Sequence, residues 1–172
     1  MSVFPLAMTP QNSYKYGGIS FGASSKNRGT RRHAACDLVV PPGSPVFAVE
    51  SGLVTDVPTK AFFQETFTVT IRHNWFVVRY AELDIERCVK EGDYVFEGQQ
   101  IGTVGMNYKG RGMLHFEMYR GTAGGPLSQT SNDHTYDYVP VLNYQRRKDL
   151  LDPTPYLDQW LLWSDPDAYF YA

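Results

Sequence analysis

Residues 67–83 read FTVTIRHNWFVVRYAEL and carry the clearest structural signal in the chain. Residues 67–73 and 76–83 are runs of β-branched and aromatic side chains, a composition that is typical of strands. Similar short runs lie on both sides of this pair, separated by turns that contain Gly or Pro, at residues 37–40, 45–49, 52–57, 94–96, 100–104 and 113–119. Many short strands with glycine turns predict a mostly β fold with a sandwich or barrel-like core.

The length of 172 residues fits one domain with extensions at its ends. Near the C-terminus, Thr154 suits the N-cap of a helix and Pro155 suits its first position, so we expect one short helix there. We therefore predict a single domain with an extended lead-in (residues 1–30), a β core (31–120), a long loop (121–150) and a C-terminal helix with a tail (151–172).

Composition and charge exclude several classes of function. Sixteen basic and eighteen acidic residues give a formal charge of −2, whereas a nucleic-acid-binding domain needs a strongly basic face. No apolar stretch is long enough for a membrane span, and the first residues lack the basic and apolar regions of a secretory signal. Cys36 and Cys88 are too few for a disulfide scaffold. We expect two free thiols, with one bridge as the alternative outside the cytosol.

Two segments contain residues that are able to bind a metal ion. His33 and Asp37 lie four residues apart in RRHAACDL, and residues i and i+4 of a strand share a face. His115 lies inside the apolar run MLHFEMY. Two imidazoles, one carboxylate and an open fourth position would make a catalytic zinc site. The alternative for His115 is a hydrogen-bonded core residue, which is the commoner role of an isolated buried histidine.

Four longer stretches carry a family resemblance: RRHAACDLVVPPGSPVFAVESGLV (residues 31–54), VTIRHNWFVVRYAEL (69–83), VKEGDYVFEGQQIGTVG (89–105) and MLHFEMY (113–119). Together they resemble the lysostaphin/LytM-type zinc metallopeptidases, which cut the peptides of bacterial cell walls. The resemblance implies a compact antiparallel β-sheet of the barrel-sandwich type with a groove over the sheet. It also implies one zinc ion, bound by His33, Asp37 and His115, and peptidoglycan as the substrate.

Two positions depart from the family pattern, and both are catalytic in the family. Met113 stands where the family has the first histidine of His-x-His, and Glu82 stands where it has a histidine after Tyr-Ala. A carboxylate beside zinc is a workable general base, so we predict that Glu82 takes a proton from water. Strand alternation puts Tyr80 on the same face as Glu82, which suggests that Tyr80 helps to hold the oxyanion.

Further side chains are candidates for supporting roles. Glu117 shares a face with His115, and it either orients that ligand or bridges to a neighbouring strand. Arg32 either binds a substrate carboxylate or is an ordinary surface residue. His73 ends a strand, where it either serves the site or bonds to the backbone. His134, in the predicted long loop, either covers the groove or faces solvent.

The favoured function is a zinc-dependent peptidoglycan endopeptidase that cleaves stem peptides or cross-links. One alternative is a catalytically degenerate module that binds metal and wall peptide. Another is a biotinyl- or lipoyl-type carrier, because residues 89–102 resemble the hybrid β motif of such proteins, but no lysine lies in a suitable tight turn. Without a signal peptide, we expect delivery to the periplasm or wall of a target bacterium by a secretion system or a phage. A secreted antibacterial effector would have an immunity protein as its inhibitor.

Overall fold

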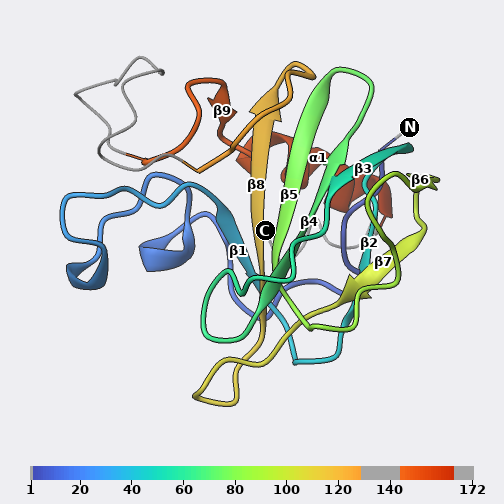
Figure 1. Cartoon of the computed structure of the whole chain (residues 1–172). Helices are drawn as coiled ribbons and strands as arrows, with labels where there is room; N and C mark the ends of the chain where they lie inside the picture. Colours follow the sequence, from blue (N-terminus) through green and yellow to red (C-terminus); the bar gives the residue numbers. More distant parts are fainter. Residues whose placement is uncertain (1, 129–143, 165–172) are drawn as a thin grey trace.

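The computed structural model describes residues 2–128 and 144–164 (Figure 1). Within these residues, seven strands form an antiparallel sheet in the order β1-β8-β5-β4-β3-β6, with β9 paired to β8 beside this path, and β2 and β7 form a second, small sheet. The elements are η1 (Gly17–Ile19), η2 (Lys26–Arg28), β1 (Cys36–Val39), β2 (Pro45–Phe47), β3 (Gly52–Asp56), β4 (Phe67–Arg72), β5 (Phe76–Leu83), β6 (Tyr94–Val95), β7 (Gln100–Thr103), β8 (Met113–Arg120), β9 (Leu150–Leu151) and α1 (Thr154–Ser164).

The β4–β5 hairpin corresponds to the two strands that were clearest in the sequence, and it lies at the centre of the larger sheet. Strand β8 pairs with β5 on the other side, where His115 lies opposite Ala81. Strand β1 follows, with Asp37 opposite His115. The antiparallel, mostly β architecture expected from the sequence is confirmed, and it makes neighbours of residues that are about 80 positions apart in the chain.

One face of the larger sheet and helix α1 enclose the hydrophobic core. Alternate residues of the central strands point into it, among them Tyr80 of β5 and Phe116 of β8. Helix α1 crosses behind the sheet in Figure 1 and packs Trp160 against Phe116, with ring centroids 6.2 Å apart. Burying a large apolar side chain stabilises a fold by about 1.5–3 kcal/mol. This face of the sheet is therefore buried in the core, and the polar residues of β1, β5 and β8 lie on the opposite face.

The lead-in packs on the hydrophobic core. Phe4, Leu6 and Tyr14 are buried in the main hydrophobic cluster, and the Tyr14 hydroxyl donates to Asp158 of α1 at 2.6 Å. The lead-in then forms the 3-10 turns η1 and η2 beside β1 (Figure 1). Every helix in residues 2–128 and 144–164 is too short and too polar to cross a membrane.

Helix α1 begins one residue earlier than predicted. Leu157 donates its backbone N–H to the carbonyl of Pro153 at 3.0 Å, so Thr154 is the first helical residue and not the N-cap. The Thr154 hydroxyl lies 3.4 Å from Sγ of the buried Cys36, and the Asp152 carboxylate accepts the Thr154 N–H at 2.9 Å. The prediction was wrong because a tertiary contact occupies the hydroxyl. His134 lies outside the described residues.

Candidate metal centre and groove

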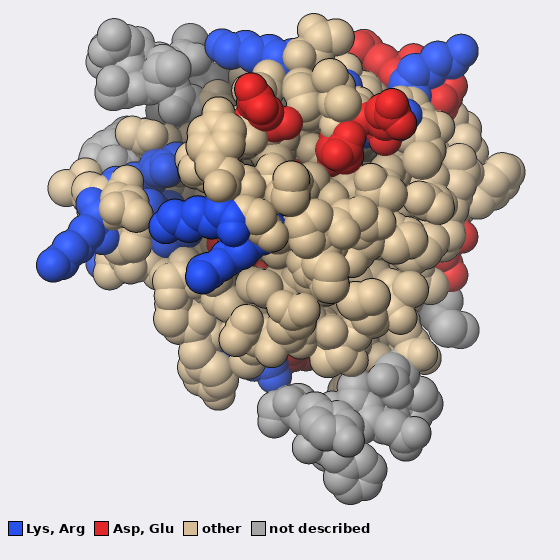
Figure 2. All heavy atoms as spheres, turned by 90° about the horizontal axis from the view of Figure 1, so that it is seen from below, with Lys and Arg blue, Asp and Glu red and all other residues tan. Residues whose placement is uncertain are grey.

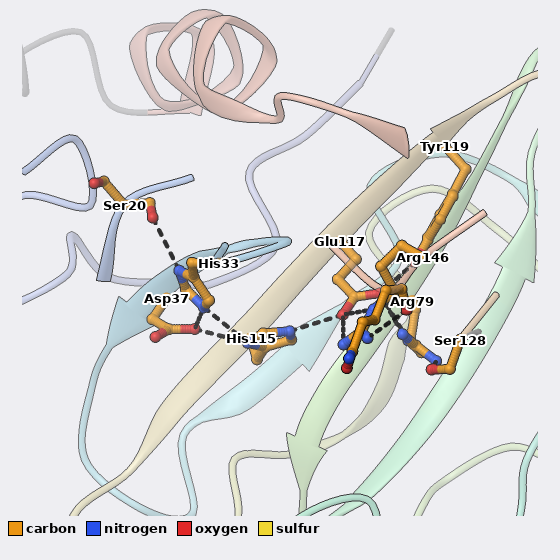
Figure 3. A network of polar contacts seen from close by, with 10 residues as sticks. Ser20, His33, Asp37, Arg79, His115, Glu117, Tyr119, Ser128 and Arg146 are labelled. Carbon is orange, nitrogen blue, oxygen red and sulfur yellow. Dashed lines mark hydrogen bonds and ion pairs between the residues drawn. The ribbon is translucent and has the colours of Figure 1, made fainter. Parts of the chain in front are cut away.

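Three side chains meet on the polar face of the larger sheet. Asp37 of β1 lies opposite His115 of β8, and His33 precedes β1. Asp37 Oδ1 lies 2.8 Å from His115 Nδ1 and 3.1 Å from His33 Nε2, and these two nitrogens are 3.3 Å apart. All three residues are buried. The structure thus brings the three predicted metal ligands together at one point (Figure 3).

Hydrogen bonds on the outer side of each imidazole select the nitrogen that faces this point. His33 Nδ1 bonds to the carbonyl oxygen of Ser20, in the lead-in, at 2.9 Å. His115 Nε2 bonds to Glu117 Oε1 at 2.9 Å. When the rings are neutral, donation through these outer nitrogens leaves the lone pairs on His33 Nε2 and on His115 Nδ1, where a metal ion would bind. Metal-binding histidines are usually oriented in this way, with the second ring nitrogen donating to a carbonyl or a carboxylate.

The charges in the cluster favour a cation at its centre. Burial alone would raise the pKa of Asp37, but hydrogen bonds from His115 and His33 outweigh it and lower the pKa to about 2. Burial would lower the pKa of His115, but Asp37 and Glu117 outweigh it and raise the pKa to about 9. A proton on His115 therefore balances these two carboxylates in the metal-free protein. A metal ion that binds here displaces that proton.

The donor set fits zinc. Ligand atoms that lie about 2.0–2.2 Å from a tetrahedral ion are roughly 3.3–3.6 Å from one another. The three donor atoms all lie within 4.8 Å of one another, so small side-chain movements are enough to reach that geometry. Two imidazole nitrogens and one carboxylate oxygen are ordinary zinc ligands, and three protein ligands leave one position open.

Glu117 is fully buried and anchors His115 from the side opposite the metal ligands. Its carboxylate also accepts hydrogen bonds from Arg79 Nε at 2.9 Å, from Arg146 Nη2 at 2.9 Å and from the Tyr119 hydroxyl (Figure 3). Burial would raise the pKa of Glu117, but the two guanidinium groups hold it well below its usual value. Arg79 belongs to β5, so Glu117 bridges to a neighbouring strand as well as contacting His115. The two roles that the sequence offered as alternatives for Glu117 are therefore both present.

Glu82 lies on the wall of a cavity of about 580 Å³ that also contains His33, Asp37 and His115. Its φ of +63° lies in the left-handed region, which costs a non-glycine residue about 1–3 kcal/mol and is often found at functional sites. Burial raises the pKa of Glu82 to about 7, while His115 lowers it and Asp37 raises it further. Within residues 2–128 and 144–164, its carboxylate makes no hydrogen bond or ion pair. A carboxylate that is buried and unpaired is available for chemistry in the cavity.

Tyr80 and His73 contact each other in a different part of the protein. The Tyr80 hydroxyl accepts the Val49 N–H at 3.0 Å and lies 3.4 Å from His73 Nε2, and His73 Nδ1 lies 3.3 Å from the Ser51 carbonyl. The structure brings neither residue to the metal-ligand cluster. The prediction that Tyr80 and Glu82 share a face was wrong, because the positive φ of Glu82 turns its side chain away from the direction that strand alternation predicts.

Replacing Tyr80 with phenylalanine is expected to lower stability and to leave the affinity of the ligand cluster for added zinc unchanged. The variant loses the hydrogen bonds of a fully buried hydroxyl and leaves the Val49 N–H unsatisfied, at a cost of about 1–3 kcal/mol. Thermal unfolding together with a zinc titration measures both effects. A variant of unchanged stability that binds zinc more weakly would show that Tyr80 supports the metal-ligand cluster.

Loops supply the rest of the cavity wall. Arg32 lines it, and its role in binding substrate stays a prediction; the ring of Phe62 packs 5.5 Å from that of His115. Met113 is absent from the described residues that line the cavity. Sequence analysis missed Arg79 and Arg146. The place of Arg79 opposite Glu117 follows from the β5–β8 register, but Arg146 has no local signal because it follows a long connection.

Known proteins share this architecture. The catalytic domain of the antimicrobial peptidase lysostaphin from Staphylococcus simulans aligns with a TM-score of 0.59 and 23% identity, covering 83% of this chain and 90% of that domain. The LytU structure aligns with a TM-score of 0.57 and 22% identity, covering 88% and 92%. The antiparallel sheet and the short C-terminal helix give this chain the lysostaphin-like fold.

The family follows from the sequence comparison. The model described as peptidase family M23 matches residues 31–131, which is more than half of the chain, and the chain belongs to this family. A curated relative, the peptidoglycan DD-endopeptidase ShyC of Vibrio cholerae, is 36% identical over 89 residues. These residues make up 51% of this chain but only 20% of ShyC, so the chain spans about a fifth of that relative's length.

Proposed function

We propose that this chain is a zinc-dependent endopeptidase that hydrolyses stem peptides or cross-links of peptidoglycan. The arrangement of His33, Asp37 and His115 around one point, with Glu82 on the wall of the same cavity, carries the proposal. Membership of peptidase family M23 supports peptide hydrolysis, and the similarity to a peptidoglycan DD-endopeptidase supports the cell wall as the source of the peptide.

Each residue has a distinct role in this proposal. His33 Nε2, Asp37 Oδ1 and His115 Nδ1 hold the ion, and Glu117 keeps the His115 ring in place. Bound zinc supplies Lewis-acid chemistry, because it polarises a carbonyl group and lowers the pKa of water to about 7. Glu82 is the general base: its carboxylate takes a proton from water and passes it to the leaving amine. A base with a pKa near neutrality is suited to both transfers.

The position of Met113 motivates the competing function, a module that binds metal and wall peptide without cutting it. A thioether cannot donate a hydrogen bond to an oxyanion, and the loss of one such donor typically lowers the rate by about 10²–10³-fold. The remaining groups, zinc and Glu82, are those that produce the nucleophile, so we favour a working enzyme. The delivery route stays a prediction with two alternatives: an antibacterial effector that has an immunity protein as its partner, or a phage enzyme. The identity of the neighbouring genes tests this prediction.

The direct test is mass spectrometry of purified muropeptides after incubation with the zinc-loaded protein, with and without a chelator. We expect cleavage that the chelator abolishes and that added zinc restores, and the product masses identify the bond. Intact muropeptides from diaminopimelate-containing and glycine-bridged walls alike, in the presence of bound zinc, would favour the non-cutting module.

A further inference from the structure

Positive charge is concentrated around the cavity that contains the metal-ligand cluster. Among the described residues that line it, five are Lys or Arg and only two are Asp or Glu. The cations are Arg28, Arg31, Arg32, Lys60 and Arg146, and the anions are Asp37 and Glu82. Figure 2 shows Lys and Arg side chains gathered on one side of the molecule, the side on which the lead-in lies in Figure 1. The concentration is local, because the chain as a whole has a formal charge of −2.

Four of these cations have no ion-pair partner within residues 2–128 and 144–164. Arg146 is paired with Glu117, whereas Arg28, Arg31, Arg32 and Lys60 form no ion pair with any residue in the described part of the chain. We call these four residues the basic rim. Their polar contacts inside the described ranges are weak or neutral: Arg28 Nη1 donates to the Gly18 carbonyl at 2.9 Å, and Arg32 Nη1 to the Gly22 carbonyl at 3.5 Å.

The rim residues are close enough to repel one another. Burial lowers the pKa of Arg31, the positive charges of Arg146 and Arg28 lower it further, and the negative charge of Glu117 opposes these effects only in part. Like charges held close together destabilise a fold, and this repulsion is relieved when a further anion binds. Guanidinium groups bind carboxylates through two parallel hydrogen bonds, and the lysine adds a point charge. The arrangement therefore suits a ligand that brings its own carboxylate into the groove.

We propose that the basic rim binds a carboxylate of the substrate and makes the groove selective for acidic peptides over neutral ones. This inference rests on the proposed function, because it assigns a substrate class to the same site. A stem peptide with a free carboxylate near the scissile bond fits the rim, and an uncharged glycine bridge does not. Three of the four rim residues lie in residues 28–32, which precede β1, so a segment outside the β-sheet determines the preference.

The test measures binding and not cleavage. Two synthetic cross-linked stem peptides of one sequence are compared, one with the free carboxylate of its diaminopimelate residue and one with that carboxylate amidated. Each is titrated calorimetrically into the zinc-loaded Glu82→Gln protein, which cannot consume the peptide. We expect the acidic peptide to bind about tenfold more tightly, since a hydrogen bond between charged groups is roughly twice as strong as a neutral one. The difference should shrink as salt is added.

Substitutions in the basic rim test which residues cause the preference for the acidic peptide. Arg31→Gln and Lys60→Gln, each combined with Glu82→Gln, should weaken binding of the acidic peptide by about three- to tenfold and leave the amidated peptide unchanged. Lys26→Gln is the matched control, because Lys26 lies in the same 3-10 turn as Arg28, is exposed and does not line the cavity. Equal affinity for the two peptides, or a loss in Arg31→Gln that affects both equally, would overturn the proposal.

The two proposals fail separately in these experiments. Preference for the acidic peptide in a protein that cleaves no muropeptide would support the basic rim and reject the proposed catalysis. Chelator-sensitive cleavage with no preference between the acidic and amidated peptides would support catalysis and reject the rim.

Discussion

Glu82→Gln is expected to lower the rate of muropeptide hydrolysis by about 10²–10⁴-fold while one zinc ion per chain stays bound. The amide has the size of the carboxylate but cannot accept the proton of an attacking water. Glu82 is not among the three clustered ligands, so the metal site should stay intact. Product formation by mass spectrometry and zinc content by elemental analysis measure the two quantities on the same sample.

Glu65→Gln is a close control for this substitution. Glu65 also has a positive φ, of +62°, but it is exposed and does not line the cavity. Its replacement should therefore leave the rate unchanged. If Glu82→Gln kept the wild-type rate, Glu82 would have no part in the mechanism, and another group would have to take the proton.

The same variant should be more stable than the wild type once the metal is removed. Burial raises the pKa of Glu82 from 4.5 to about 7 in the folded state, so between these pH values the folded protein binds more protons than the unfolded chain. The free energy of unfolding of the wild type therefore falls as the pH rises from 4.5 to about 7. The Glu82→Gln variant does not show this loss. At pH 8 we expect the metal-free Glu82→Gln variant to have a free energy of unfolding about 1–3 kcal/mol higher than that of the metal-free wild type, or a Tm roughly 3–10 °C higher. This difference should disappear near pH 4.

Local sequence patterns were sufficient for the strands, but they only made His33, Asp37 and His115 candidates, and the proposal that these three residues form one ligand set came from the family resemblance. The β-branched runs predicted β4 and β5, and the antiparallel pairing of β5, β8 and β1 then places Asp37 next to His115. The position of His33 needed more information, because it precedes β1 and is oriented by the carbonyl of Ser20 in the lead-in. A residue outside a strand is not placed by strand alternation.

Residues whose positions depend on backbone irregularity or on distant contacts were not predictable in the same way. The positive φ of Glu82 breaks the alternation that would have grouped it with Tyr80. Arg146 reaches Glu117 from a segment 29 residues later in the chain, and Arg31 gathers with Lys60 only after the lead-in folds beside the sheet. Such placements follow from tertiary packing, for which hydrophobic periodicity contains no information.

His115→Ala is expected to abolish zinc binding and, with it, all hydrolysis. His115 is the ligand that links the metal to the rest of the protein: its Nδ1 faces Asp37, and its Nε2 bonds to Glu117. Removing it leaves two ligands, and it also leaves two buried carboxylates without the imidazolium that balances them in the metal-free state. The variant should therefore lose stability even without zinc, by about 1.5–3 kcal/mol, because Asp37 and Glu117 each lose a charged hydrogen-bond partner, although Asp37 keeps His33 and Glu117 keeps its two arginines.

Zinc-dependent stabilisation separates the ligand role from the structural one. A ligand present at 100 times its Kd stabilises the folded state by about 2.7 kcal/mol, which raises Tm by roughly 5–11 °C for a chain of this size. The wild type should show this shift on adding zinc, and His115→Ala should not. His73→Ala is the matched control, since His73 is equally buried but contacts Tyr80 on the other side of the sheet, so it should lose stability and keep the full shift. A full zinc shift in His115→Ala would contradict the assignment of His115 as a ligand.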